Sequence, residues 1–206
     1  MKTVGIFGCS WSWGIESFKD NWPYELSILN KSVMIKNYSY SATSLEWSYK
    51  QFKKYKNNCD ITIFQCTLPF RLTHQLRTIN IKKQTENLYT LDSDHAHKNL
   101  YRWTPAVEEK KFKRYNKKLI HPYIDYIKQG DDKILNDYYV LIDKIIKKSN
   151  YCFFFLQPKS KSTKYQKIDC IEKECKNFHN YMHDDHHFNL EGNKWLANYI
   201  NQKVLL

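Results

Sequence analysis

Two short segments near opposite ends of the chain carry the residue types needed for nucleophilic catalysis. The first reads Gly8-Cys9-Ser10-Trp11-Ser12-Trp13-Gly14 and follows a short apolar run, Thr3 to Gly8, that is typical of a buried strand. A helical pattern comes next, so Ser10 is expected on a strand-to-helix turn. Backbone N–H groups and the start of a helix can stabilise an oxyanion there. The same position also suits an ordinary helix N-cap, a role that serine commonly takes.

The second segment reads His183-Asp184-Asp185-His186-His187-Phe188-Asn189-Leu190-Glu191-Gly192-Asn193 and precedes a helix with apolar residues on one side. A carboxylate placed three residues before a histidine in a tight loop can orient the imidazole, which then works as a general base. The combination of this loop with Ser10 favours serine chemistry over a plain N-cap.

These two segments resemble the first and last sequence blocks of the SGNH (GDSL-like) hydrolases. The first block of that family reads Gly-Asp-Ser with a glycine a few positions later, and this chain has Gly8-Cys9-Ser10 and Gly14. The last block reads Asp-x-x-His, then Pro or another residue, then Asn, and this chain has Asp184, His187 and Asn189. The resemblance implies Ser10 as the nucleophile, His187 as the base and Asp184 as its orienting partner, with Asp185 as the alternative acid.

The resemblance also implies an oxyanion hole. In the family, the second block contributes the N–H of a glycine, and here Ala42 (or Ser41) stands at that place. The third block contributes an asparagine side chain, which is absent from Gln65-Cys66-Thr67-Leu68-Pro69-Phe70-Arg71. Thr67 or Arg71 can donate a hydrogen bond instead. The expected donors are therefore the N–H groups of Ser10 and Ala42, helped by Thr67 or Arg71.

The pattern along the chain predicts an α/β fold made of alternating strands and helices. Strands are expected at 3–8, 32–40, 60–66 and 151–156, with a weak strand or helix start near 168–171. Helices are expected at 13–29 with a break at Trp22-Pro23, and at 44–55, 107–128, 131–148 and 190–204. This order predicts a three-layer α/β/α domain with a flavodoxin-like parallel sheet of about five strands. Residues 1–206 are expected to form a single domain, with an insertion or lid at about 68–105.

Composition limits the class of protein. Hydrophobic residues make up 42% of the chain and aromatic residues 16%, as in a folded protein. No run approaches the roughly 20 apolar residues that span a bilayer, and no signal peptide is recognisable, so a cytoplasmic location is expected. The six cysteines contain no CxxC pair, which favours reduced thiols.

Three alternatives remain open at this point. The cluster of His179, His183, Asp184, Asp185, His186 and His187 could bind zinc or manganese, although neither a metal nor another cofactor is expected. Cys9, beside Ser10, could be the nucleophile. A basic surface that carries the net charge of +12 could, together with the insertion, bind nucleic acid or an anionic glycan without catalysis. The aromatic and arginine residues of the insertion concerned are Tyr89, Tyr101, Trp103, Arg71, Arg77 and Arg102. The lysines that give this net charge are also the residues that solvated helix faces carry.

The expected function is a serine esterase or acylhydrolase acting on a short acyl ester. By analogy with the family, an O-acetyl ester of a carbohydrate is the expected kind of substrate. Transfer of the acyl group to another hydroxyl uses the same machinery. The oligomeric state is not predicted.

Overall fold

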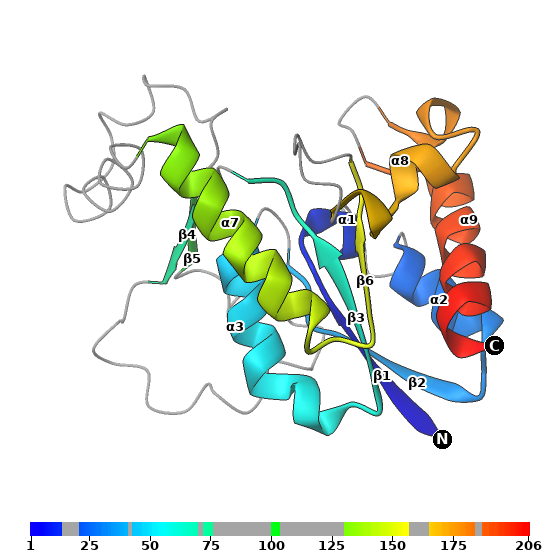
Figure 1. Cartoon of the computed structure of the whole chain (residues 1–206). Helices are drawn as coiled ribbons and strands as arrows, with labels where there is room; N and C mark the ends of the chain where they lie inside the picture. The colour runs from blue at the N-terminus through cyan, green and yellow to red at the C-terminus, as the bar shows by residue number, and fades with distance from the viewer. Residues whose placement is uncertain are drawn as a thin grey trace.

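A five-stranded parallel sheet forms the centre of the molecule (Figure 1). The computed structural model describes residues 1–13, 21–40, 43–69, 72–75, 100–103, 130–156, 165–183 and 187–206. The strand order is β2-β1-β3-β6-β7, with all neighbours parallel. Counted along the chain within this sheet, the order is 2-1-3-4-5, which is the flavodoxin-like arrangement.

The helices and strands follow one another in alternation. Their bounds are β1 (Lys2–Phe7), α1 (Ser10–Trp13), α2 (Trp22–Leu29), β2 (Val33–Asn37), α3 (Leu45–Tyr55), β3 (Ile61–Cys66), β4 (Leu72–Gln75), β5 (Leu100–Trp103), α7 (Asp131–Ile146), β6 (Tyr151–Phe154), β7 (Asp169–Cys170), α8 (Ile171–Glu174) and α9 (Leu190–Ile200). Short 3-10 turns lie at Lys56–Asn58, Tyr165–Lys167 and His179–Tyr181, and a π-helical turn at Asn201–Leu205 ends the chain.

Helices cover both faces of the sheet, which gives three layers. Figure 1 shows α3 and α7 on one face and α2 and α9 on the other. Strand residues alternate between the two faces, so Ile6 and Ile63 pack with Trp22 of α2, while Phe7 and Phe64 pack against α3 and α7. The predicted three-layer α/β/α class is confirmed.

Local signals explain most of the element boundaries. Asn21 caps α2, where its Oδ1 accepts a hydrogen bond from the Tyr24 N–H at 2.9 Å, and Pro23 stands in the first turn. The expected break at Trp22-Pro23 is therefore the start of a separate helix. Ser44 caps α3 in the same way, with its Oγ 3.3 Å from the Trp47 nitrogen. The helix expected at 107–128 lies outside the described residues.

The two ends of the expected insertion pair with each other. β4 and β5 form a two-stranded antiparallel sheet in which Leu72 is opposite Trp103 and Gln75 is opposite Leu100. The residues between them lie outside the described part of the chain. That 68–105 is an insertion or lid on a single domain stays a prediction.

The described part of the chain has neither a disulfide nor a membrane-spanning helix. All six cysteines are free. Burial raises the pKa of the Cys66 thiol well above its ordinary value and that of Cys152 to about 11. Within the described ranges, no helix has the length and apolar character needed to cross a bilayer.

A polar cluster attaches the C-terminal helix to the edge of the sheet. Oδ2 of Asp169, on edge strand β7, accepts hydrogen bonds from the hydroxyls of Tyr151 at 2.6 Å and Tyr199 at 3.0 Å. Lys203 Nζ lies 3.3 Å from the same oxygen. Burial raises the pKa of Asp169, but the two tyrosines and Lys203 together lower it more, so the pKa lies below its ordinary value.

Replacing Asp169 with Asn is expected to lower the free energy of unfolding at neutral pH. Because the folded-state pKa of Asp169 is depressed, its ionised form contributes stability above the ordinary carboxyl pKa of about 4. This contribution is lost as the pH falls through the folded-state pKa. Urea unfolding of the wild type and Asp169→Asn between neutral and acid pH measures it. The two stabilities should converge in acid, and a pH-independent difference would contradict the role given to the charge.

Candidate active site

Ser10 lies where β1 runs into the first helical turn. β1 ends at Phe7, and Ser10 is the first residue of α1. The carbonyl oxygen of Cys9 accepts the N–H groups of Ser12 and Trp13, each at 3.0 Å, so Cys9 occupies the cap position and Ser10 follows it. The residue is buried, with 8% of its surface exposed. The strand-to-helix turn predicted for Ser10 is confirmed.

The turn before Ser10 is fixed by contacts from β2 and α3. The carbonyl oxygen of Gly8 accepts the Ser48 hydroxyl at 2.9 Å, and the Thr43 hydroxyl and the Tyr40 N–H each lie 3.4 Å from it. Asn37, the last residue of β2, donates from Nδ2 to the carbonyl oxygen of Ser12 at 2.6 Å. Two neighbouring elements therefore hold the main chain on either side of Ser10.

Gln65 of β3 holds the same turn from the opposite direction. Its Oε1 accepts the Cys9 N–H at 3.0 Å and lies 3.3 Å from Cys9 Sγ and 3.5 Å from the Ser12 hydroxyl. Its Nε2 donates to the carbonyl oxygen of Cys66 at 3.0 Å. Gln65 has no exposed surface. A buried amide with partners on both of its ends fixes its neighbours in one arrangement.

Ser12 completes this polar group under the helical turn. Its Oγ accepts the indole N–H of Trp22 at 3.1 Å and is fully buried. The sequence interpretation did not identify Gln65, Ser12 or Ser48 as site residues. The only signal was a glutamine inside an apolar strand, since a buried polar side chain needs hydrogen-bond partners.

His187 lies in a short hairpin that leads into α9. The His183 N–H donates to the carbonyl oxygen of His187 at 2.7 Å, and the Asn189 N–H donates to that of Tyr181 at 2.8 Å. Met182 and Phe188 form an antiparallel bridge between these two bonds. The side chain of His187 is partly buried, and its Nε2 is shielded from solvent.

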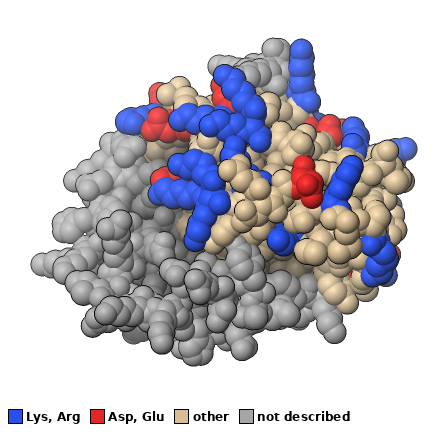
Figure 2. Space-filling view, turned by 90° about the horizontal axis from the view of Figure 1, so that it is seen from below, with Lys and Arg blue, Asp and Glu red and all other residues tan. Residues whose placement is uncertain are grey.

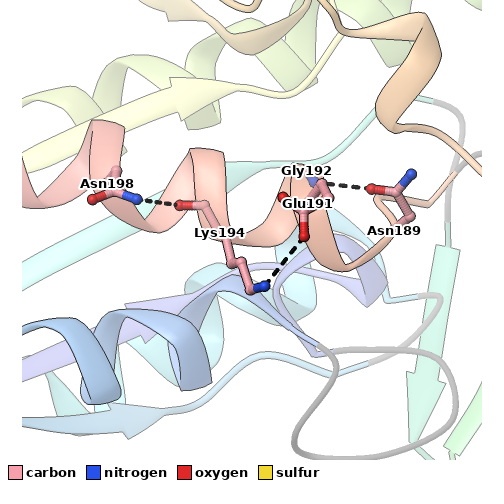
Figure 3. Close-up of polar contacts among 5 residues, drawn as sticks. All are labelled: Asn189, Glu191, Gly192, Lys194 and Asn198. Atoms are coloured by element: carbon pink, nitrogen blue, oxygen red, sulfur yellow. Dashed lines mark hydrogen bonds and ion pairs between the residues drawn. The ribbon is translucent and has the colours of Figure 1, made fainter.

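The start of α9 keeps this hairpin in place. Asn189 caps the helix, with its Oδ1 accepting the Gly192 N–H at 2.9 Å (Figure 3). A Cβ on Gly192 would come within 2.7 Å of the Phe188 ring, so glycine lets Phe188 lie against the first turn. Asn193 donates from Nδ2 to the carbonyl oxygen of Phe188 at 3.1 Å. The residue that follows His187 is therefore fixed by both packing and hydrogen bonds.

An aromatic contact links the Ser10 turn to the His187 hairpin. Trp11 stacks on Phe155 with ring centroids 4.3 Å apart and planes 19° from parallel. Phe188 contacts the same Phe155 ring at 4.7 Å. Phe155 comes directly after β6, at the carboxyl end of that strand. The residues that follow Ser10 and His187 thus pack on one shared ring at the carboxyl edge of the sheet, where parallel α/β folds bind their ligands.

The other predicted site residues fall into two groups. Thr67 follows β3 at the same edge, is 1% exposed, and its carbonyl oxygen accepts the Tyr138 hydroxyl at 2.7 Å. Ala42, Arg71, Asp184 and Asp185 lie outside the described residues. The triad and the oxyanion hole therefore stay predictions.

The alternatives can be compared with the same structure. Cys9 has no exposed surface, and its Sγ lies beside Gln65 in the interior. Among the described residues, no group of three or more His, Cys, Asp or Glu side chains is arranged to hold a metal; residues 184–186 of the expected cluster are not among them.

Several of the basic side chains in the described part of the chain lie on helices, in separate groups. Figure 2, the view from below Figure 1, shows such groups with acidic residues among them. Within helices, Lys50 pairs with Glu46 at 2.7 Å and Lys133 with Asp137 at 2.9 Å. Lys53 lies over the ring of Tyr49. These contacts are those of solvated helix faces.

Comparison with known proteins gives solved structures only. No family model and no curated protein matches the chain. One solved structure is named as a lipolytic protein of the G-D-S-L family from Veillonella parvula DSM 2008, at 10% identity and a TM-score of 0.46, covering 98% of both chains. Another, provisionally named to the same family, is from Desulfitobacterium hafniense DCB-2, at 9% identity and a TM-score of 0.44, covering 98% of this chain and 99% of the other. At these TM-scores the likeness carries no weight in assigning a function.

Proposed function

We propose that this chain is a serine esterase in which Ser10 is the nucleophile and His187 the general base. The observation that supports the proposal is the shared Phe155 ring, on which Trp11 and Phe188 both pack. The residues immediately before them are Ser10 and His187, so both belong to one small region at the carboxyl edge of the sheet. A serine activated by an imidazole needs this proximity.

The proposed reaction has two steps. Ser10 Oγ attacks the ester carbonyl while His187 accepts the hydroxyl proton, and the proton then passes to the departing alcohol. Water attacks the acyl-serine with His187 again as base, which releases the acid and restores Ser10. Asp184, or Asp185 in its place, would orient the imidazole. The N–H groups of Ser10 and Ala42, with Thr67 or Arg71, would stabilise the negative oxygen of each tetrahedral intermediate.

The proposed substrate is a short acyl ester, with an O-acetylated carbohydrate as the first class to test. This choice follows from the sequence resemblance of the first and last blocks. The segment at 68–105 would select the alcohol part of the ester, because the segment begins two residues after β3, at the site's edge of the sheet. Acyl transfer to another hydroxyl in place of water would follow the same steps.

A fluorophosphonate probe tests the nucleophile directly. We expect a single covalent adduct on folded protein, which peptide fragmentation locates on Ser10 and not on the adjacent Cys9. Ser10→Ala should abolish the adduct, while Ser27→Ala, a serine of α2 bonded to the Tyr24 carbonyl oxygen, should leave it unchanged. Comparing Asp184→Asn with Asp185→Asn then identifies the acid, since labelling should slow only when the orienting carboxylate is replaced.

Absence of an adduct on the folded wild type would contradict the proposal. Salt-dependent binding of nucleic acid by that same unlabelled protein would favour the non-catalytic alternative. An adduct on Cys9 would replace the serine mechanism with a thiol one.

A further inference from the structure

The peptide bond between Gly8 and Cys9 is held from both sides. In a trans peptide the carbonyl and the N–H point in opposite directions. On one side the Gly8 carbonyl accepts the Ser48 hydroxyl at 2.9 Å, and on the other the Cys9 N–H donates to Gln65 Oε1 at 3.0 Å. Both Ser48 and Gln65 are buried, with exposed fractions of 1% and 0%. This peptide plane therefore has one orientation.

The next peptide plane, between Cys9 and Ser10, is fixed by α1. The Cys9 carbonyl points into the helix, where it accepts the N–H groups of Ser12 and Trp13. The Ser10 N–H of the same plane must point the opposite way, out of the helical turn. With both planes fixed, the two backbone dihedrals of Cys9 are fixed as well. The direction of the Ser10 N–H and the position of its Cα then depend on the bonds that hold these two planes, the bond from the Cys9 N–H to Gln65 among them.

Gln65 also connects this turn to the end of β3, the strand beside β1 in the sheet. Its Nε2 donates to the Cys66 carbonyl at 3.0 Å, so the side chain cannot rotate without losing a second buried hydrogen bond. Cys66 precedes Thr67, one of the expected oxyanion donors. A single amide thereby joins the ends of β1 and β3.

We propose that Gln65 is a positioning residue that sets the orientation of the Ser10 turn. The effect of Gln65 on the labelling rate rests on the proposed function. The effect of Gln65 on the orientation of the turn is independent of that function. Gln65 makes no contact with the reacting atoms in this proposal and acts through its hydrogen bonds to the turn and to the Cys66 carbonyl.

The kinetic experiment uses two variants and one matched control. Gln65→Leu removes all the hydrogen bonds of the amide, and we expect Ser10 labelling by the fluorophosphonate to slow about 100-fold, as expected for a misplaced reacting group. Thr62→Val, in the same strand, removes the bonds between Thr62 Oγ1 and Asn150 at the other end of β3, and should leave the labelling rate unchanged. Equal slowing in both variants would reduce Gln65 to a structural role.

Gln65→Glu adds a pH readout that a purely structural role would not change. A protonated glutamic acid can reproduce both bonds of the amide, whereas the carboxylate cannot donate to the Cys66 carbonyl and brings a negative charge behind the oxyanion. The ratio of the variant's labelling rate to the wild-type rate should therefore rise as the pH falls. A ratio that stays constant over the pH range in which the variant is folded would overturn the proposal.

Amide hydrogen exchange separates this proposal from the esterase proposal. Gln65→Leu should speed exchange at the Cys9 N–H, and Thr62→Val should not. If wild-type Ser10 is not labelled but Cys9 exchange responds, the esterase proposal fails and the positioning role stands. If Ser10 is labelled and neither rate nor exchange changes in Gln65→Leu, the positioning role fails and the esterase stands.

Discussion

Replacing His187 with Ala is expected to slow fluorophosphonate labelling of Ser10, and any ester hydrolysis, by about 100- to 10,000-fold. The serine hydroxyl is a weak nucleophile until a base removes its proton, and His187 is the proposed base. Its Nε2 is shielded from solvent, and the hairpin fixes its backbone through the His183 N–H at 2.7 Å. Stopped-flow labelling and hydrolysis of an acetyl ester would measure the loss.

The matched control for this variant is His183→Ala. His183 lies in the same hairpin with an exposed side chain, and its contact with His187 uses the backbone N–H, which the substitution keeps. The labelling rate should therefore stay near that of the wild type. Equal losses in His183→Ala and His187→Ala, restored by added zinc, would favour the metal alternative over the serine mechanism.

The elements could be predicted from the sequence because their signals are local. Asn21 and Pro23 mark the start of α2, and Ser44 caps α3 through a nitrogen three residues later. Apolar runs of strand length give β1, β3 and β6, and alternating helices between parallel strands leave few possible layer arrangements. Edge strand β7 has only two residues, so its pattern was too short to separate from a helix start.

The residues that hold the Ser10 turn could not be predicted in the same way. Gln65 is 56 positions from Cys9, and Ser48 is 40 positions from Gly8, so both contacts exist only after the sheet and α3 have assembled. Nothing in the local pattern of a strand says which polar residue will face a turn. Ser10 itself was recognisable because its neighbours along the chain, a strand and a helix start, define its position.

Gly8 is a position at which a one-carbon change should affect both the fold and the proposed chemistry. A Cβ there would lie 2.7 Å from Gln65 Oε1, 3.0 Å from Gln65 Cβ and 3.0 Å from Ser12 Oγ. Gln65 cannot move aside, because it is buried and bonded at both ends of its amide. The added methyl must displace either the amide or the turn.

We therefore expect Gly8→Ala to lower the free energy of unfolding by about 1 to 3 kcal/mol, as overpacking of a dense interior does. Labelling of Ser10 should slow about 100-fold at a temperature where the variant is still folded. Thermal unfolding and labelling rates, measured on the same samples, separate the two effects.

Gly130→Ala is the control for stability alone. Gly130 has a φ of +79° and no atom within 4 Å of the added Cβ, so alanine strains the backbone without meeting a neighbour. This variant should lose stability through backbone strain and keep the wild-type labelling rate. Gly8→Ala could also keep the wild-type labelling rate. The turn would then tolerate displacement of Gln65, and close packing at Gly8 would contribute to stability but not to the reactivity of Ser10.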